Sequence, residues 1–176
     1  ASKQKLRDKR GLFIQWLQGY EVDGQSVRTI LATLGSVFPN VEIWHTNGFD
    51  LLFLASDQPI EYDVRKLRAK VAQSPYRECL NNAWRGDGLE AFLAHFVATD
   101  RLARTLVDSE SHLLNTDDRN LVEYGFARTA GGSDLFRFDE IENYSRQILS
   151  HRPRIMNGTV DWARIRAESV LLKAVP

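Results

Sequence analysis

The sequence reads LFIQWL at residues 12–17, VEIWH at residues 41–45 and FDLLFLA at residues 49–55. Each run is short, largely apolar and rich in the aromatic or β-branched residues that strands favour. The first run is apolar almost throughout, which predicts a strand that is buried on both faces. These three runs therefore predict three strands in the first part of the chain.

A helix is predicted between the first two strands. Asp23 is a suitable N-cap, and from Val27 to Phe38 apolar side chains recur at intervals of three and four residues. Pro39 and Asn40 then end the helix. Because a helix connects two strands of one sheet, we expect those two strands to run parallel.

A tight turn is predicted between the second and third strands. Asn47-Gly48 lies between two apolar runs, and both residue types tolerate the positive φ angles that a two-residue hairpin turn requires. The third strand is therefore expected to run antiparallel to the second.

The chain after Pro59 is predicted to be mainly helical. Apolar stripes indicate helices at residues 62–72, 89–97, 102–107, 141–149 and 165–172, and alternation at residues 121–127 indicates one candidate strand. We therefore expect an α/β protein with a three-stranded mixed sheet in residues 1–58 and a mainly helical extension in residues 59–176.

Composition narrows the class of protein. The 176 residues contain 23 basic and 23 acidic side chains, and this balance argues against a general nucleic-acid binder. No apolar run approaches the ~20 residues that span a bilayer. One cysteine, Cys79, excludes an internal disulfide and a thiolate zinc cluster. We interpret the chain as a cytoplasmic globular protein.

The residues alone indicate no catalytic or metal site. Cys79 lacks the sequence context of a nucleophile and is interpreted as a partly buried structural thiol. No two histidines lie three or four residues apart. His95 adjoins an apolar helical face and is interpreted as a boundary residue, and a metal site from His112, Asp117 and Asp118 is the weaker alternative. The Asp117-Asp118 pair fits a turn better than it fits acid–base catalysis.

Gln15 is the distinctive polar residue of the first strand. Its amide could face a ligand pocket at the carboxyl end of the strand, since open α/β sheets bind ligands there. It could equally be an edge residue that faces water. Spacing alone leaves both interpretations open.

Four segments resemble the spermidine synthase family, and more narrowly the large bacterial proteins that carry a spermidine-synthase-like module with extra domains. They are GLFIQWLQGY at 11–20, SVRTI at 26–30, FPNVEIW at 38–44 and DLLFLAS at 50–56. LNTDDRNLVEY at 114–124 resembles the end of that module. The resemblance implies a Rossmann-like, methyltransferase-type fold, in which the three strands are the fifth, sixth and seventh. It also implies that the seventh strand inserts antiparallel between the other two.

The resemblance implies a function as well. The complete family enzyme transfers an aminopropyl group from decarboxylated S-adenosylmethionine to a diamine. Its glycine-rich nucleotide loop and catalytic aspartate precede the fifth strand, so we expect a C-terminal portion that binds no cofactor and is inactive alone. Gln15 matches a glutamine that faces the polyamine, and Trp44 and His45 fall near an aromatic position of the same pocket.

A non-catalytic protein-interaction or dimerisation module is the alternative. The strand from Leu12 to Leu17 would have an unpaired apolar edge if no further strand lay beside it, and such edges invite pairing. We expect this edge to be covered by another chain, as in a homodimer, or by residues 121–127.

Overall fold

The computed structural model describes residues 11–19, 22–46, 50–108, 114–116, 118, 121–122 and 137–173. Its main sheet has the order β1-β3-β2-β5, and every pair of neighbouring strands is antiparallel. The strands are β1 (Phe13–Leu17), β2 (Asn40–His45), β3 (Leu51–Ser56) and β5 (Phe96–Ala98). The expected α/β class is confirmed, with four strands in this sheet where three were expected.

The expected arrangement of the first three strands is confirmed. β3 lies between β1 and β2 and is antiparallel to both, so β1 and β2 run in the same direction. The hairpin that joins β2 to β3 is closed by the amide of Thr46, which donates to the carbonyl of Asp50 at 2.9 Å. The predicted turn residues Asn47 and Gly48 lie outside the described residues.

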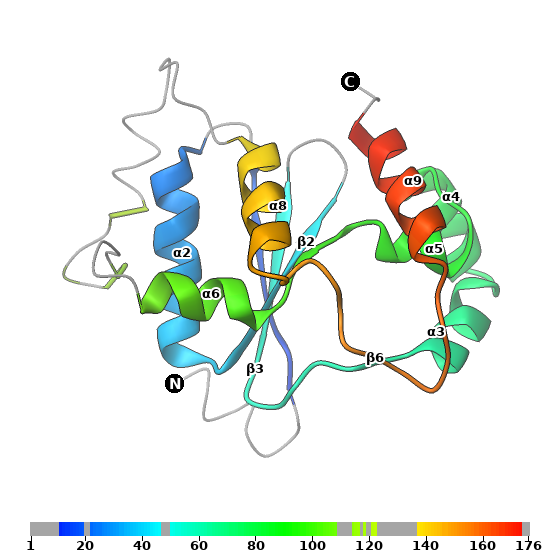
Figure 1. Ribbon diagram of the computed structural model, residues 1–176, viewed down its shortest axis with the longest axis horizontal. Helices are drawn as coiled ribbons and strands as arrows, with labels where there is room; N and C mark the ends of the chain where they lie inside the picture. The colour runs from blue at the N-terminus through cyan, green and yellow to red at the C-terminus, as the bar shows by residue number, and fades with distance from the viewer. Residues whose placement is uncertain are drawn as a thin grey trace.

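Helix α2 (Gly24–Val37) connects β1 to β2, as predicted (Figure 1). Asp23 is its N-cap, and the Asp23 carboxylate accepts a 2.6 Å hydrogen bond from the amide of Ser26. This bond satisfies one of the amides that a helix start leaves without a partner. Val27 and Leu31 lie fully buried on the face that meets the sheet.

The helix expected over residues 89–97 is wrong in its second half. Helix α5 (Gly88–Leu93) ends early, and the chain then forms β5, in which Phe96 pairs with Trp44 and Ala98 pairs with Ile43. An apolar run fits a buried helix or a buried strand equally well. Pairing with β2 decides between them here.

The remaining elements follow Ser56. The helices are α3 (Val64–Val71), α4 (Tyr76–Trp84), α6 (Asp100–Val107), α8 (Phe138–Gln147) and α9 (Trp162–Lys173), and β4 (Tyr62–Asp63) pairs in parallel with β6 (Ile155–Met156). All but α4 coincide with predicted helices. Leu121 and Val122 are helical, so the strand predicted at 121–127 is wrong at its start. Residues 123–127 lie outside the described part.

Two apolar clusters lie on opposite faces of the sheet. The first contains Ile43 and Phe53 from the sheet and takes in α2, α6 and the first residue of α8. The second contains Trp44 and takes in α3, α4 and α5, and Figure 1 shows these three helices and α9 gathered at one end of the molecule. Elements from both sides of residue 58 contribute to the first cluster. The domain boundary expected between residues 58 and 59 stays a prediction.

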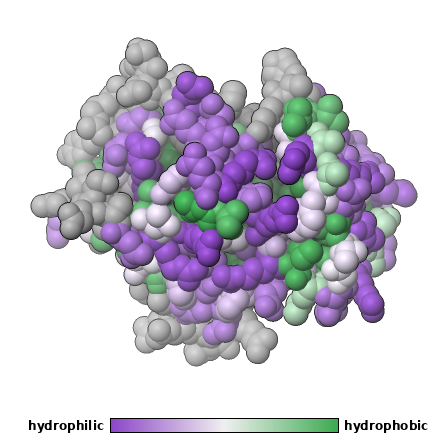
Figure 2. Space-filling view, in the orientation of Figure 1, coloured by the Kyte–Doolittle hydropathy of each residue, from purple (hydrophilic) through white to green (hydrophobic). Residues whose placement is uncertain are grey.

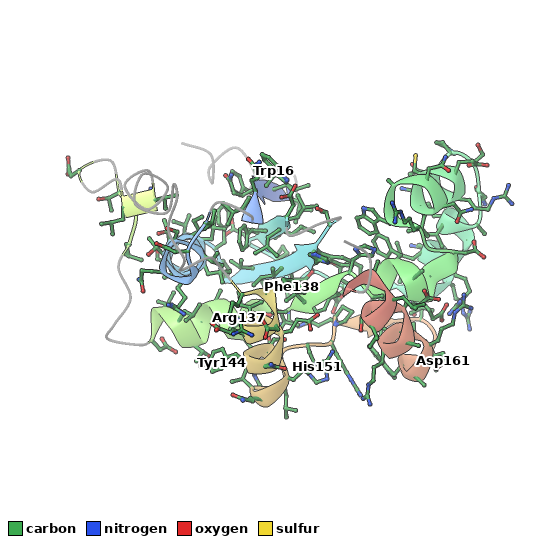
Figure 3. The ribbon with its side chains drawn as sticks, turned by 90° about the horizontal axis from the view of Figure 1, so that it is seen from above. Trp16, Arg137, Phe138, Tyr144, His151 and Asp161 are labelled. Carbon is green, nitrogen blue, oxygen red and sulfur yellow. The ribbon has the colours of Figure 1, made fainter. Side chains whose placement is uncertain are left out.

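Strand β1 is an edge strand, and the expectation that it is buried on both faces is wrong. Ile14 is 58% exposed and Trp16 is 52% exposed, and within the described residues β1 pairs with β3 alone. Trp16 lies at the open side of the sheet (Figure 3). The helices of the second cluster cover β2 on this face and leave β1 bare, because they pack around Trp44.

Candidate functional site

Gln15 is exposed on β1. Its side-chain amide donates a 2.8 Å hydrogen bond to the carbonyl of the next residue, Trp16. It pairs across the sheet with Phe53, so its side chain projects on the same face as the buried Phe53 ring. Of the two interpretations, the edge residue facing water is the one that the structure describes.

Trp44 lies on the opposite face of the sheet. It is 3% exposed, and its ring contacts those of Phe92 and Phe96 at centroid distances of 5.0 and 5.2 Å. Trp44 pairs with Leu52, and Leu52 pairs with Trp16, so these three side chains share one face. Trp44 is therefore a central side chain of the second apolar cluster.

His45 returns to the face that carries Gln15. Its ring is buried and lies 4.4 Å from the ring of Phe138. His45 pairs with Leu51, which in turn pairs with Leu17, so the intervening strand β3 separates it from β1. The described structure thus does not bring Gln15, Trp44 and His45 into one pocket.

A buried carboxylate that the sequence reasoning did not select lies beside Trp44. Glu42 is 2% exposed in the middle of β2. The hydroxyl of Tyr62 donates to its Oε2 at 2.5 Å, and the indole nitrogen of Trp44 lies 3.5 Å from the same oxygen. Two side chains, Trp44 from β2 and Tyr62 from β4, therefore contact this one buried acidic group.

Burial raises the pKa of Glu42 to about 7, because the ionised form loses its hydration. The bonds from Tyr62 and Trp44 and the charge of Arg154 favour the ionised form and act in the opposite direction. Burial also raises the pKa of Tyr62, so its hydroxyl stays a donor. Glu42 can consequently gain or lose a proton near neutral pH.

Charged side chains continue this polar group toward the α6 end of the sheet. The guanidinium of Arg154 donates to Asp100 at 2.7 Å and to the side chain of Asn40 at 3.3 Å. The amide of Tyr62 donates to the carbonyl of Arg154 at 2.8 Å. Arg154 therefore ties β4 and the start of β6 to the main sheet.

His95 is an interior residue and was expected at a boundary. It is 1% exposed, and its Nδ1 lies 2.9 Å from the carbonyl of His45, which can only accept. Burial lowers the pKa of His95 to about 4, so the ring is neutral at pH 7 with its proton on Nδ1. This hydrogen bond holds the His95 ring in place between the Trp84 ring and β2.

An apolar pocket of about 220 Å³ opens between α3, α4 and α5. Its lining includes the rings of Tyr76, Trp84 and Phe92, together with Leu80. Cys79 also lines it and is exposed, where a partly buried thiol was expected. The side-chain lining can accept an apolar group and offers no charged partner for a polar one.

The described residues contain no group of three histidine, cysteine or acidic side chains arranged to hold a metal ion. His112 and Asp117 lie outside those residues. Within the same part of the chain, no helix has both the length and the apolar character needed to cross a membrane. Comparisons with protein-family models, curated proteins and solved structures find no match.

Proposed function

We propose that this chain is the C-terminal portion of a spermidine-synthase-like protein with a Rossmann-like fold. In the complete protein, upstream strands would carry the nucleotide loop and the acid that takes a proton from the attacking amine. The present chain would complete the sheet and contribute Gln15 to the polyamine side of the pocket.

One observation carries this proposal, namely the position of β3. The unit β1-α2-β2-β3 has its last strand inserted antiparallel between two strands that run in the same direction. That is the order that the resemblance of residues 11–56 implies for the last three strands of the family fold.

The open edge of β1 supports the same proposal. Its backbone groups on that side have no strand beside them in the described part of the chain, and Ile14 and Trp16 are exposed next to it. A further strand placed there would pair the backbone and bring cover to the two apolar side chains.

A non-catalytic dimerisation module is the second candidate, and the same exposed edge favours it. Two copies could pair along β1 and cover Ile14 and Trp16 with each other's surface. In that case the chain would need no upstream strands.

Calorimetry with putrescine in the presence of methylthioadenosine separates the two candidates. The first candidate is supported if Gln15→Ala abolishes the heat of binding. The control is Gln25→Ala, a matched change on α2, which should keep it. Binding that survives Gln15→Ala contradicts the assigned role of Gln15. Absence of binding together with a tight homodimer supports the second candidate.

A second assay tests the catalytic expectation. The purified chain is expected to show no aminopropyl transfer, because it has no identified residue to accept the proton of the attacking amine. Detectable turnover by the chain alone would refute this.

A further inference from the structure

A small pocket of about 50 Å³ lies between the end of α8, the segment that follows it and α9. Its basic lining consists of Arg146 in the last turn of α8, His151 and Arg152 in the connection, and Arg166 on α9. Three separate segments of the chain therefore direct basic side chains at one hollow. Figure 2 shows hydrophilic side chains gathered over α8 and toward α9.

The three arginines of this pocket lack a carboxylate partner among the described residues. Other arginines nearby do have one: Arg154 pairs with Asp100 at 2.7 Å, and Arg164 pairs with Glu168 at 3.5 Å. Guanidinium groups that line one pocket in excess over carboxylates repel one another. A bound anion would relieve that repulsion.

His151 gives an independent sign that the pocket accepts a ligand. Its Nδ1 is buried and has no hydrogen-bond partner in the described part of the protein. Figure 3 shows His151 next to the end of α8. A buried polar atom without a partner is costly, so the histidine nitrogen is available to a ligand atom.

The charges around His151 agree with this geometry. Burial lowers its pKa, and the positive charges of Arg146, Arg152 and Arg166 lower it further, while the Ser145 backbone acts in the opposite direction. The imidazole is therefore neutral near pH 7. A neutral ring has one proton, which it donates to the Ser145 backbone, so the free nitrogen is an acceptor and can take the O–H of a monohydrogen phosphate.

Two further side chains bear on the pocket: one sets its net charge, and the other holds one of its arginines in place. Glu142 also lines it, so three guanidiniums and one carboxylate leave two positive charges in excess. The guanidinium of Arg152 lies 4.7 Å from the centre of the Trp162 ring, and this contact holds it in place. The excess matches a doubly charged anion.

We propose that this pocket binds a single phosphate group, held by Arg146, Arg152 and Arg166 with His151 as a further contact. Guanidinium groups present paired donors that match the oxygens of a phosphate, and three of them can serve three oxygens. The volume suits one such group. The inference does not depend on the proposed function.

Titration with inorganic phosphate, followed by calorimetry near neutral pH at constant ionic strength, tests the proposal. We expect saturable binding at one site, weakened about tenfold or more in Arg166→Gln, since a charge-assisted bond is lost. The matched control is Arg164→Gln, which removes the same charge from the same helix outside the pocket. We expect its affinity to stay within about twofold of the parent. Circular dichroism checks that both variants are folded.

Two further probes identify the ligand. Phenyl phosphate that binds at least as tightly as phosphate indicates a phosphoryl group on a larger solute, whereas binding of phosphate alone indicates the free ion. Acetate that binds as tightly as phosphate would overturn the assignment to phosphate. Lack of saturation, or equal weakening in the Arg164 and Arg166 variants, would overturn the site itself.

Discussion

The hydroxyl of Tyr62 donates a 2.5 Å hydrogen bond to the buried carboxyl group of Glu42. Glu42 belongs to the main sheet, and Tyr62 belongs to the small β4-β6 pair. The bond therefore joins the two sheets that the described part of the chain forms. Because the carboxyl group has a pKa near neutrality, this junction is expected to respond to pH.

The free energy of unfolding should fall as the pH rises through neutrality. The pKa of Glu42 is raised from 4.5 to about 7 in the folded protein, so the folded state holds this proton more tightly than the unfolded state. The benefit is complete below pH 4.5 and is lost as the pH rises through about 7. Ionisation of Glu42 alone is expected to lower the free energy of unfolding by about 3 kcal/mol across this pH range.

Urea unfolding at a series of pH values measures this effect. Glu42→Gln should flatten the dependence over that range, whereas Glu61→Gln, which removes an exposed carboxylate, should leave it as it is in the parent. A Glu42→Gln curve that runs parallel to the parent curve would show that another group is responsible.

Tyr62→Phe is expected to raise the pKa of Glu42 further. The substitution removes the shortest hydrogen bond to the carboxylate and leaves the distant Trp44 contact. We expect a loss of about 1–3 kcal/mol in unfolding free energy, larger above pH 7 than below it, because the ionised carboxylate depends most on the bond. Tyr76→Phe, at a tyrosine that is 47% exposed, is the control and should change little. An equal loss at all pH values would mean that packing, not the bond, is affected.

Gly35 permits the close approach of α2 and α6. A Cβ atom at this position would lie 3.0 Å from the Val107 side chain and 3.3 Å from the Ala103 side chain. Gly35→Val should therefore destabilise the protein by about 1–3 kcal/mol through overpacking. Gly24 on the same helix faces only the Arg28 side chain at 3.6 Å, so Gly24→Ala should be tolerated. Thermal unfolding of both variants compares them, and equal stability would argue against a tight interface.

Association along β1 predicts that a charge at Ile14 weakens a dimer. In sedimentation equilibrium, Ile14→Lys should raise the dissociation constant about tenfold, because a charge would enter an apolar contact. Leu171→Lys is the control, since Leu171 is 62% exposed on α9. If the parent is a monomer at all concentrations, or if both variants behave alike, pairing along β1 is ruled out.

The sequence predicted the local elements better than the contacts between distant ones. Helix α2 follows from its apolar stripe and from Asp23, and the hairpin follows from Asn47-Gly48 between two apolar runs. Strand β5 was missed because residues 89–97 read as one apolar helix, and only pairing with β2 reveals the strand. The exposure of β1 was missed because apolar composition alone cannot show that an edge is bare.

The polar groups show the same limit. A single acid in VEIWH carries no local sign of burial, and Glu42 becomes enclosed only when Tyr62 and Arg154 reach it from other parts of the chain. The basic pocket likewise combines arginines from α8, α9 and their connection. Neither site has a short sequence motif.

The coding sequence upstream of Ala1 shows whether β1, β2 and β3 are the end of a larger sheet. We predict an in-frame segment that contains a strand, a glycine-rich turn and a helix, followed by further strands before residue 11. An upstream reading frame that is closed, or that encodes no such strand-turn-helix unit, would contradict the assignment to a spermidine-synthase-like protein.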